Sequence, residues 1–329
     1  MQPPPALREA IDREVEGVAL RDLARAAESL SRRYRAEIRD HRFHVDDTLA
    51  ARAYLTTRLP ATYAATARSL SAVIAARPDF APRSLLDVGA GPGTATWAAA
   101  AQWPGLEEAR LVEGSAAMRA IGARLAAALP IRADWTEADI EAALPGLAAR
   151  DLVLMTYVLD ELAPDARAAL IPLLWQMTGD VLVIVEPGTS AGWQRILGAR
   201  DQLIAAGAHI LGPCPHARAC PLRPPDWCHF ATRLPRSRLH REAKGGTVPW
   251  EDEKFIYLAV SRRPSILSEA RVIAPPRASK ADLTLKLCEP HGTAAAVMVP
   301  KRDKERFKRV RRLEWGDSCP ATPQSPPQA

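Results

Sequence analysis

The sequence predicts an α/β protein built on a doubly wound parallel sheet, and three observations support that class. Five short apolar runs alternate with alanine-rich stretches of helical periodicity from Ser84 onward. A glycine-rich turn stands between the first apolar run and the helical stretch that follows it. Of the 329 residues, 47% are hydrophobic and 25% are charged, which is typical of a globular chain with a large core.

The first 80 residues precede the predicted sheet and contain no strand-like run. Apolar residues recur at helical spacing in LRDLARAAESLSRRYRAEI and in YLTTRLPATYAATARSLSAVIAA, so we predict a helical N-terminal region over residues 1–80. The chain starts without an apolar signal core and has no run of 18 apolar residues. We therefore expect a cytoplasmic protein without a membrane span, or a mitochondrial matrix protein if the source is eukaryotic.

The central sheet is expected within residues 81–262. Its first five strands are predicted from the runs SLLDVGAG, ARLVEGS, PIRADW, DLVLMTYVL and DVLVIVEPG, and FIYLAVSR (255–262) is a later strand. Within this domain, residues 206–250 crowd Pro, Cys, His and Arg together and are too polar for a strand and too broken for a helix. We interpret this segment as a Cys-rich insertion organised by something other than an apolar core.

The C-terminal part is predicted to form a small β unit over residues 263–315, from the runs RVIAPPR, DLTLKLCEP and TAAAVMVPK. Residues 316–329 are rich in proline and are predicted to be a disordered tail. Within the β unit, KRDKERFKRVRR (301–312) holds eight basic residues against two acidic ones. Together with a net charge of +6 and a pI near 9.2, this segment indicates either a phosphate-binding patch or a solvated helix face.

The glycine-rich turn lies in LLDVGAGPGTAT, where an apolar strand leads into Gly89, Gly91 and Gly93 and a helix follows. Glycines let the backbone approach a ligand closely, and the N-terminus of the following helix offers free N–H donors. Glu113 ends the next predicted strand, twenty positions after Gly93, where a carboxylate can accept hydrogen bonds from ribose hydroxyls. The alternative for Glu113 is a helix-capping role.

The form D-V-G-A-G-P-G, with Asp87 before the glycines, resembles the first motif of class I S-adenosylmethionine methyltransferases more than the fingerprint of dinucleotide-dependent enzymes. The resemblance implies a Rossmann-like fold in which the three glycines surround the methionine part of S-adenosylmethionine and Glu113 holds its ribose. Asp87 belongs to the same cofactor site by this resemblance. Asp134 and Trp135, after the third strand, are implied to neighbour the adenine.

The fourth predicted strand ends in TYVLDEL (156–162), where methyltransferases commonly place residues that face the substrate. The Asp/Asn/Ser-Pro-Pro-aromatic tetrad that orients an amino nitrogen is missing, and no cysteine nucleophile stands there. Asp160 and Glu161 fit a cap on the following helix equally well. The catalytic residues are therefore unknown, although methyl transfer can proceed by positioning alone.

Three of the five cysteines, Cys214, Cys220 and Cys228, lie within fifteen residues at the spacing C-x5-C-x7-C. In a reducing compartment, closely spaced cysteines indicate a metal site more than disulfides, and an odd total argues against a fully paired set. Cys288, in the predicted β unit, is available as a distant fourth ligand. Thiolates of this kind suit either zinc or an iron–sulfur cluster.

Other residues compete for the fourth position. His216 and His229 adjoin the cysteines, and each is equally consistent with a hydrogen-bonded or exposed histidine. Cys319 falls in the predicted tail, where we expect a free thiol. The spacing differs from the C-x3-C-x2-C of radical S-adenosylmethionine enzymes and from the paired C-x2-C of common structural zinc sites, so radical chemistry is not assigned.

Several segments together carry a more specific resemblance. They are YLTTRLPATYAA, LLDVGAGPGTATWAA, YVLDEL, VEPGTSAGWQRILGAR, CPHARACPL, WCHF, PWEDEKFIYLAVSR, LCEPHG and EWGD, spread over residues 30–317. On these segments the chain resembles the Rsm22 family, which comprises mitochondrial small-ribosomal-subunit proteins and their bacterial relatives. The cysteine block and the EPGT and EDEKF segments are its most specific parts, since many methyltransferases share the glycine turn.

The family resemblance implies a class I methyltransferase fold and a 4Fe–4S cluster held by Cys214, Cys220, Cys228 and Cys288, with zinc as the alternative. It also implies association with the small ribosomal subunit and its rRNA during assembly or translation, and a contact between residues 301–312 and rRNA phosphates. Methyl transfer stays open, because the implied factor is either an active rRNA methyltransferase or a relative without catalysis. We expect a monomer apart from the ribosome.

Two other hypotheses are consistent with the sequence. One is a small-molecule methyltransferase whose cysteines hold structural zinc, which metal analysis distinguishes. The other is a redox- or iron-sensing module whose cluster controls docking on the ribosome. In that case replacing Cys214 by Ser abolishes ribosome binding and leaves cofactor binding intact.

Overall fold

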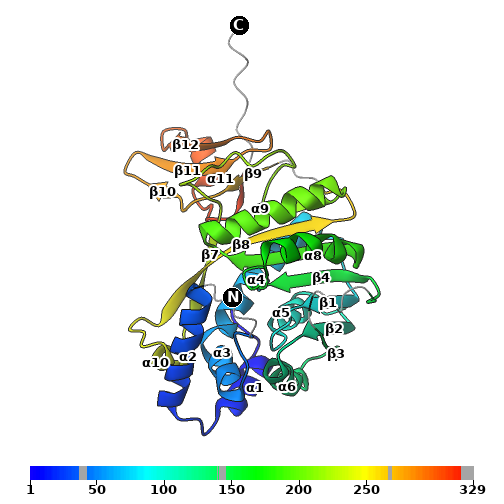
Figure 1. The fold of residues 1–329 in the computed structure, drawn as a ribbon. Coiled ribbons are helices and arrows are strands. Elements are labelled where there is room, and N and C mark those ends of the chain that lie inside the picture. The colour runs from blue at the N-terminus through cyan, green and yellow to red at the C-terminus, as the bar shows by residue number, and fades with distance from the viewer. Residues whose placement is uncertain (37–42, 139, 141–145, 266–268, 320–329) are drawn as a thin grey trace.

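The strands form two sheets, one of eight strands and one of five, in the part of the chain that the structure describes (Figure 1). The structure is a computed structural model, and it describes residues 1–36, 43–138, 140, 146–265 and 269–319. The larger sheet takes its strands from the middle of the chain, and the smaller sheet takes its strands from the C-terminal part.

The larger sheet is mainly parallel and doubly wound, which confirms the predicted Rossmann-like class. Its strand order is β3-β2-β1-β4-β5-β8-β6, with β7 paired to β8. Strands β1 to β5 run parallel, whereas β8 runs antiparallel to β5, β6 and β7. The strands are β1 Ser84–Val88, β2 Glu108–Glu113, β3 Arg132–Glu137, β4 Arg150–Thr156, β5 Thr178–Pro187, β6 His209–Gly212, β7 Phe230–Pro235 and β8 Trp250–Ser261.

The strand order reverses direction at β1 and β4, so the connecting helices cover opposite faces of the sheet. On one face α5 packs against α4, and on the other α8 packs against α9 (Figure 1). The carboxyl ends of β1, β2, β4 and β5 therefore meet at one edge of the sheet, where ligands bind in folds of this kind. The helices that follow these strands are α5 Thr94–Gln102, α6 Ala116–Ala126, α8 Pro164–Gln176 and α9 Ser190–Ala205.

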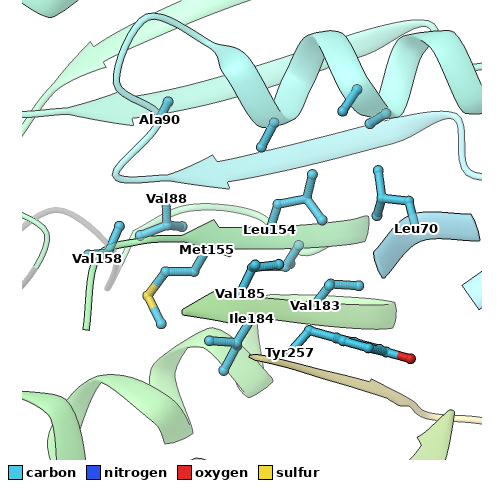
Figure 2. Packing of buried hydrophobic residues seen from close by; sticks show 14 of the residues in the cluster. Leu70, Val88, Ala90, Leu154, Met155, Val158, Val183, Ile184, Val185 and Tyr257 are labelled. Carbon is cyan, nitrogen blue, oxygen red and sulfur yellow. The ribbon is translucent and has the colours of Figure 1, made fainter. Parts of the chain in front are cut away.

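The main core lies along the central strands. The runs Leu152–Met155 in β4 and Val181–Val185 in β5 are fully buried, because helices cover both faces of these strands. Figure 2 shows Leu154, Met155 and Val183 from these strands packed between neighbouring elements. Continuous apolar runs of this kind predicted the strands correctly from the sequence.

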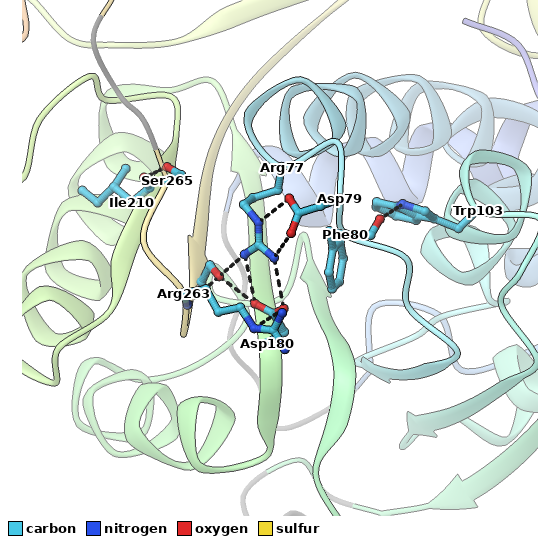
Figure 3. Close-up of polar contacts among 9 residues, drawn as sticks. Arg77, Asp79, Phe80, Trp103, Asp180, Ile210, Arg263 and Ser265 are labelled. Atoms are coloured by element: carbon cyan, nitrogen blue, oxygen red, sulfur yellow. Dashed lines mark hydrogen bonds and ion pairs between the residues drawn. The ribbon is translucent and has the colours of Figure 1, made fainter.

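Helices α1 Pro5–Val15, α2 Leu20–Arg35, α3 Thr48–Thr57 and α4 Leu59–Ala76 precede the sheet. Helix α4 is tied to the amino end of β5 by Arg77, a residue that is 5% exposed (Figure 3). Arg77 donates to both carboxylate oxygens of Asp79 at 2.9 Å, to Ser261 at 2.9 Å and to Asp180 at 3.3 Å. Since a buried charge is costly unless it is paired, this network fixes the helical region on the sheet.

The predicted insertion at 206–250 is more regular than expected. It contains β6, β7, α10 (Arg238–Ala243) and the first residue of β8, which begins five residues before the predicted 255. The sequence did not predict these elements, because they are short or alternate with charged residues. The irregular part of this segment is mainly the loop of residues 213–229, which holds three cysteines.

The smaller sheet has the order β10-β11-β9-β13, with β12 also paired to β11. Its core includes Leu283, Leu285, Leu287 and Val310, and the alternation of burial along β11 matches a strand with one covered face. Cys319, expected as a free thiol in a disordered tail from residue 316, is 2% exposed and lies in β13. The elements are β9 Ala270–Val272, β10 Arg277–Ala278, β11 Asp282–Cys288, β12 Ala294–Pro300, α11 Lys304–Val310 and β13 Ser318–Cys319.

None of the helices within the described ranges is long and apolar enough to cross a membrane.

Candidate cofactor site and cysteine cavity

The glycine turn joins β1 to α5 at the carboxyl edge of the sheet. Gly89, Gly91 and Gly93 all have positive φ angles, of 68°, 54° and 83°. A Cβ atom at Gly89 would lie 2.4 Å from the Val158 side chain, so a larger residue there would have to displace the segment after β4. The turn is thus a tight backbone loop whose N–H groups are used within the protein: Gly89 and Ala90 donate to the Val112 carbonyl oxygen, Gly93 donates to the Ala90 carbonyl oxygen, and Gly91 donates to Glu113.

Glu113 closes this loop from the end of β2. One carboxylate oxygen accepts a hydrogen bond from the Gly91 N–H at 2.8 Å, and the other accepts from the Ser115 N–H at 2.7 Å. The residue is 9% exposed, and burial raises the pKa of its carboxyl, against the effect of these hydrogen bonds. The cap of α6 is Ser115, which accepts from the Met118 N–H, so Glu113 does not cap that helix by itself.

Asp87 lies beneath the loop and is fully buried. Its Oδ2 accepts hydrogen bonds from the Thr96 N–H at 3.1 Å and the Thr96 hydroxyl at 2.7 Å, which ties β1 to the first turn of α5. Its Oδ1 has no hydrogen-bond partner among the described residues. Burial, as the main cause, raises the pKa of Asp87 to about 6. Asp87 therefore holds the loop from below.

Asp134 and Trp135 lie inside β3 and not after it, because β3 continues to Glu137. The ring of Trp135 packs against Gly122 of α6 and lies near Gly93, where added Cβ atoms would be 2.4 Å and 3.8 Å from the ring. Neighbouring side chains of a strand point to opposite faces, and Asp134 pairs with Arg132 at 3.4 Å. The structure thus brings Trp135 to the glycine turn and leaves Asp134 on the other face of β3.

The segment after β4 has a distinctive backbone. Tyr157 has a φ of 58°, which is uncommon for a residue other than glycine and often marks a constrained site. Its hydroxyl donates to the Glu253 carboxylate of β8 at 2.8 Å. Helix α8 starts at Pro164 without a side-chain cap, so the alternative role of Asp160 and Glu161 as caps of that helix is not observed.

Glu186, in the EPGT segment at the end of β5, is fully buried. It accepts from the Leu159 N–H at 3.0 Å and from Arg195 Nε of α9 at 2.7 Å. The carboxylate thereby joins the segment after β4 to α9, which places a buried ion pair directly behind the carboxyl edge. No sequence pattern predicted this pair.

The four predicted metal ligands line one cavity. Cys214, Cys220 and Cys228 come from the loop of residues 213–229, and Cys288 is the last residue of β11 in the smaller sheet. The structure thus brings the distant cysteine to the other three. Among the described residues, no group of three or more His, Cys, Asp or Glu side chains is arranged to hold a single metal ion.

The cavity is apolar, and this controls the charge of the thiols. Burial raises the pKa of Cys214 and Cys228, and it raises the pKa of Cys288 to about 12. The thiols also raise one another's pKa by mutual repulsion, which is a sign of their proximity. Four thiolates therefore need a positively charged centre between them.

The two rival histidines occupy different places. His216 lines the cavity, is 6% exposed, and its Nε2 lies 3.5 Å from the Cys288 sulfur. His229 stacks on Trp227 and meets the edge of Trp315, with ring centroids 5.3 Å and 4.7 Å apart. His229 is therefore part of an aromatic group, and His216 is the histidine nearest to the thiols.

The cavity and the cofactor edge are connected. The indole N–H of Trp227, next to Cys228, donates to the Gly188 carbonyl in the EPGT segment at 3.1 Å. The Gly188 N–H donates to the Lys254 carbonyl oxygen of β8. A Cβ atom at Gly188 would lie 2.7 Å from the Phe255 backbone nitrogen. Because β8 approaches so closely, only glycine fits at position 188. The Trp227 hydrogen bond to Gly188 links the cysteine loop to β5, the strand that carries Glu186.

The basic segment of residues 301–312 forms α11 and its flanks on the smaller sheet (Figure 1). Phe307 and Val310 face that sheet's core, so the basic residues are left outside. The exposed bases are Lys301, Arg302, Lys304, Lys308, Arg309, Arg311 and Arg312. The charges are gathered on one short element, as a phosphate-facing patch requires.

A sheet of this order, with a glycine turn after β1 and a carboxylate at the end of β2, defines a protein of the Rossmann-like methyltransferase fold. Comparison with known families then identifies a narrower group. The profile of the family described as mitochondrial small ribosomal subunit Rsm22 matches residues 48–320. The chain belongs to the Rsm22 family, which confirms the resemblance found in the sequence.

Curated relatives agree with this assignment. The human (Homo sapiens) ribosome assembly protein METTL17, mitochondrial, is 29% identical over 294 residues, which cover 81% of this chain and 62% of the relative. The Rsm22-cox11 tandem proteins 1 and 2, mitochondrial, of Schizosaccharomyces pombe are 26% identical over 193 residues, or 45% of this chain and 26% of theirs. The chain therefore spans less than two thirds of the length of these relatives.

Two solved structures illustrate the structural similarity. An O-methyltransferase family protein from Burkholderia thailandensis has a TM-score of 0.45 at 12% identity, over 75% of this chain and 73% of its own. The magnesium protoporphyrin IX methyltransferase ChlM from Synechocystis PCC 6803, with bound SAH, has a TM-score of 0.41 at 15% identity, over 61% and 84%.

Proposed function

We propose that the protein is an S-adenosylmethionine-binding, iron–sulfur-containing factor that acts on the small ribosomal subunit during assembly or translation. The observation that carries this proposal is the convergence of four cysteines on one cavity beside a methyltransferase-type cofactor edge. Membership of the Rsm22 family and the name of its human relative, a ribosome assembly protein, support the ribosomal partner. In a bacterial cell this activity belongs to the cytoplasm.

The cofactor part of the proposal depends on the glycine turn. The N–H groups of Thr94 and Ala95, at the start of α5, are suited to the carboxylate and polar groups of the methionine part. Glu113, held by Gly91 and Ser115, still has lone pairs free to accept ribose hydroxyls. Trp135 provides an apolar ring beside Gly93 for the adenine, whereas the predicted adenine contact of Asp134 has no structural support.

S-adenosylmethionine, when bound, supplies an electrophilic methyl group. The residues of this chain that face the acceptor side are those after β4, where Tyr157 is fixed by Glu253. An arrangement of this kind can orient an acceptor without a dedicated base, so the protein is either an rRNA methyltransferase or a binding relative. The catalytic residues stay unassigned.

The metal part of the proposal depends on donor chemistry. Four cysteines that line one cavity fit the donor set of a 4Fe–4S cluster, which has one iron for each cysteine, and a tetrahedral zinc ion is the alternative. Cys214, Cys220, Cys228 and Cys288 would hold the cluster. Such a centre fastens the smaller sheet, with α11, to the larger one, and the exposed bases of α11 are proposed to contact rRNA phosphates.

The test is binding of both partners by purified protein. Isothermal titration with S-adenosylmethionine and co-sedimentation with isolated small ribosomal subunits are both expected to show specific binding. A protein that shows neither would disprove the proposal. Binding of S-adenosylmethionine without the ribosome, together with zinc in the cavity, would favour the alternative of a small-molecule methyltransferase.

A further inference from the structure

One wall of the cysteine cavity carries a buried arginine that the preceding function does not use. Arg200 of α9 lines the cavity together with the four cysteines and is 1% exposed. It is among the largest fully buried side chains of the described chain. Arginine stays charged in proteins, so this position has a permanent positive charge in an apolar surrounding.

The hydrogen bonds of Arg200 satisfy the guanidinium only in part. Its Nη2 donates to the carbonyl oxygens of His216 and Arg218, at 2.9 Å and 2.6 Å. Its Nη1 lies 3.3 Å from Asp201, whose side chain is 73% exposed. Its Nε–H is buried and has no hydrogen-bond partner among the described residues.

The charge balance of Arg200 is therefore incomplete. Of the described carboxylates, Asp201 pairs with it, and water screens that pair strongly because Asp201 is at the surface. Burial of a cation without a buried anion is unfavourable, so such an arrangement is expected where an anion occupies the adjoining space. The cavity beside Arg200 is lined by thiols, and the structure brings Arg200 within interaction range of Cys214.

A second cation lies within interaction range of Cys214 and Cys228. Arg271 of β9 is the register partner of Cys288, and it donates to the Pro213 and Gly316 carbonyl oxygens, each at 3.0 Å. Four thiolates around a 4Fe–4S cluster in its oxidised form, or around a zinc ion, carry a total charge of −2. The two arginines thus offset part of the charge of the loaded centre, against the buried Glu289 carboxylate that follows Cys288.

We infer that Arg200 is a positioning residue for the metal centre, which compensates its negative charge and donates its Nε–H toward the sulfur shell. Through Nη2 it also holds the backbone of the cysteine loop at His216 and Arg218. The inference rests on the proposed function, since it takes the four cysteines as ligands. It assigns to α9, and not to the cysteine loop, control over the electron affinity of the centre.

A redox measurement tests this role. Wild type, Arg200→Met and Arg200→Lys are purified anaerobically, analysed for iron and sulfide, and titrated for their midpoint potential by EPR. Reduction adds a negative charge, so the loss of a nearby cation in Arg200→Met is expected to lower the equilibrium constant for reduction at least tenfold. For a one-electron couple this is a fall of about 59 mV or more. Arg200→Lys, which keeps the charge, is expected to lie closer to wild type.

The outcomes separate the inference from the function on which it rests. Wild type without iron and sulfide would reject the cluster and, with it, the metal part of the proposed function. An Arg200→Met protein that holds the cluster at the wild-type potential would overturn the inference alone. If Arg200→Met gives no soluble protein, Arg200→Gln replaces it, because its amide can still donate to a loop carbonyl oxygen while the charge is lost. The same fall in potential is then required.

Discussion

At the scale of single residues, two buried carboxylates shape the cofactor edge in different ways. Glu113 binds the glycine turn from the side through backbone N–H groups, and Asp87 holds the first turn of α5 from below. One is placed to meet a ligand, and the other supports the loop that meets it. Substitutions at the two positions should therefore affect different measurements.

Replacing Glu113 by Ala is expected to lower the affinity for S-adenosylmethionine at least tenfold. The variant loses the proposed ribose acceptor and the anchor of the Gly91 N–H, and a hydrogen bond to a charged group is worth about 1.5–3 kcal/mol. Isothermal titration measures the change. Glu107→Ala is the control, since Glu107 precedes the amino end of β2, away from the cofactor edge, and has a 57% exposed side chain. Equal affinities for Glu113→Ala and wild type would contradict the ribose role.

Asp87→Asn should change how stability depends on pH. The pKa of Asp87 is raised from 3.8 to about 6, so its contribution to stability is full below about pH 3.8 and is lost as the pH rises through 6. Between pH 5 and pH 7.5 this loss is about 1.4 kcal/mol, and an amide does not titrate.

Urea unfolding of wild type and Asp87→Asn at both pH values, without cofactor, measures this loss. The stability of wild type relative to the variant is expected to fall by about that amount from pH 5 to pH 7.5. Asp303→Asn, at the exposed cap of α11, is the control and should show no such change. A pH-independent difference between wild type and Asp87→Asn would refute the explanation.

The residues that the sequence predicted are those whose roles depend on local geometry. The residues that follow or end a strand are of this kind, because apolar runs in the sequence predict where strands end. They are Gly89, Gly91, Gly93 and Glu113. Arg200 was not predicted, because its partners His216 and Arg218 are 16 and 18 positions away in a loop without periodicity. The support of α5 by Asp87 was not predicted for a similar reason, since a single hydrogen bond between residues nine positions apart produces no repeating pattern in the sequence.

At the scale of elements, α11 has the most direct consequence for binding. Its exposed bases are proposed to contact phosphates, and each lost contact reduces the salt dependence of RNA binding by about 0.7–0.9 in the slope of log K against log salt. Replacing Lys304, Lys308, Arg309 and Arg311 by Gln is therefore expected to lower the slope by about 3. Fluorescence anisotropy with an rRNA fragment at several salt concentrations measures it.

The matched control removes the same charge from α2. Its exposed arginines, Arg21, Arg25, Arg32 and Arg35, lie on the helical region away from the smaller sheet (Figure 1). Their replacement by Gln should leave most of the salt slope in place. If the α2 variant loses more of the salt slope than the α11 variant, the RNA-binding surface lies on the N-terminal helices and not on α11.

The central elements of the sheet followed from the sequence better than its edges did. β1, β4 and β5 are covered on both faces and read as continuous apolar runs. β6 and β7 pair with β8 at the edge of the sheet, where polar side chains and prolines are tolerated, so they were hidden in the predicted insertion. β3 also ended later than predicted, which moved Asp134 and Trp135 into the strand.

At the scale of the whole molecule, the cysteine cavity joins the two sheets. Three of the proposed ligands belong to the loop between β6 and β7, and the fourth ends β11. Periodicity predicted the two sheets separately, but their junction is not encoded in any local pattern. The cysteine pattern offered Cys288 as a distant fourth ligand beside His216 and His229, and the family resemblance then favoured Cys288.

Removal of the metal should loosen this junction selectively. A chelator under anaerobic conditions is expected to increase amide hydrogen exchange in residues 213–229 and in β9 and β11, while β1 and β4 keep their protection because their core is independent of the cavity. Mass spectrometry of the exchanged peptides measures both regions. Equal protection with and without metal in residues 213–229 would show that the centre does not organise the loop.

The most direct measurement is the metal content of protein purified anaerobically, with Cys288→Ser and Cys319→Ser as a pair. Both cysteines are buried in the smaller sheet, but Cys288 alone of the two lines the cavity. About four irons and four sulfides per chain are expected in wild type and in Cys319→Ser, and a large loss of both in Cys288→Ser. Zinc in place of iron, or a cluster that survives in Cys288→Ser with full occupancy, would contradict a four-cysteine iron–sulfur centre.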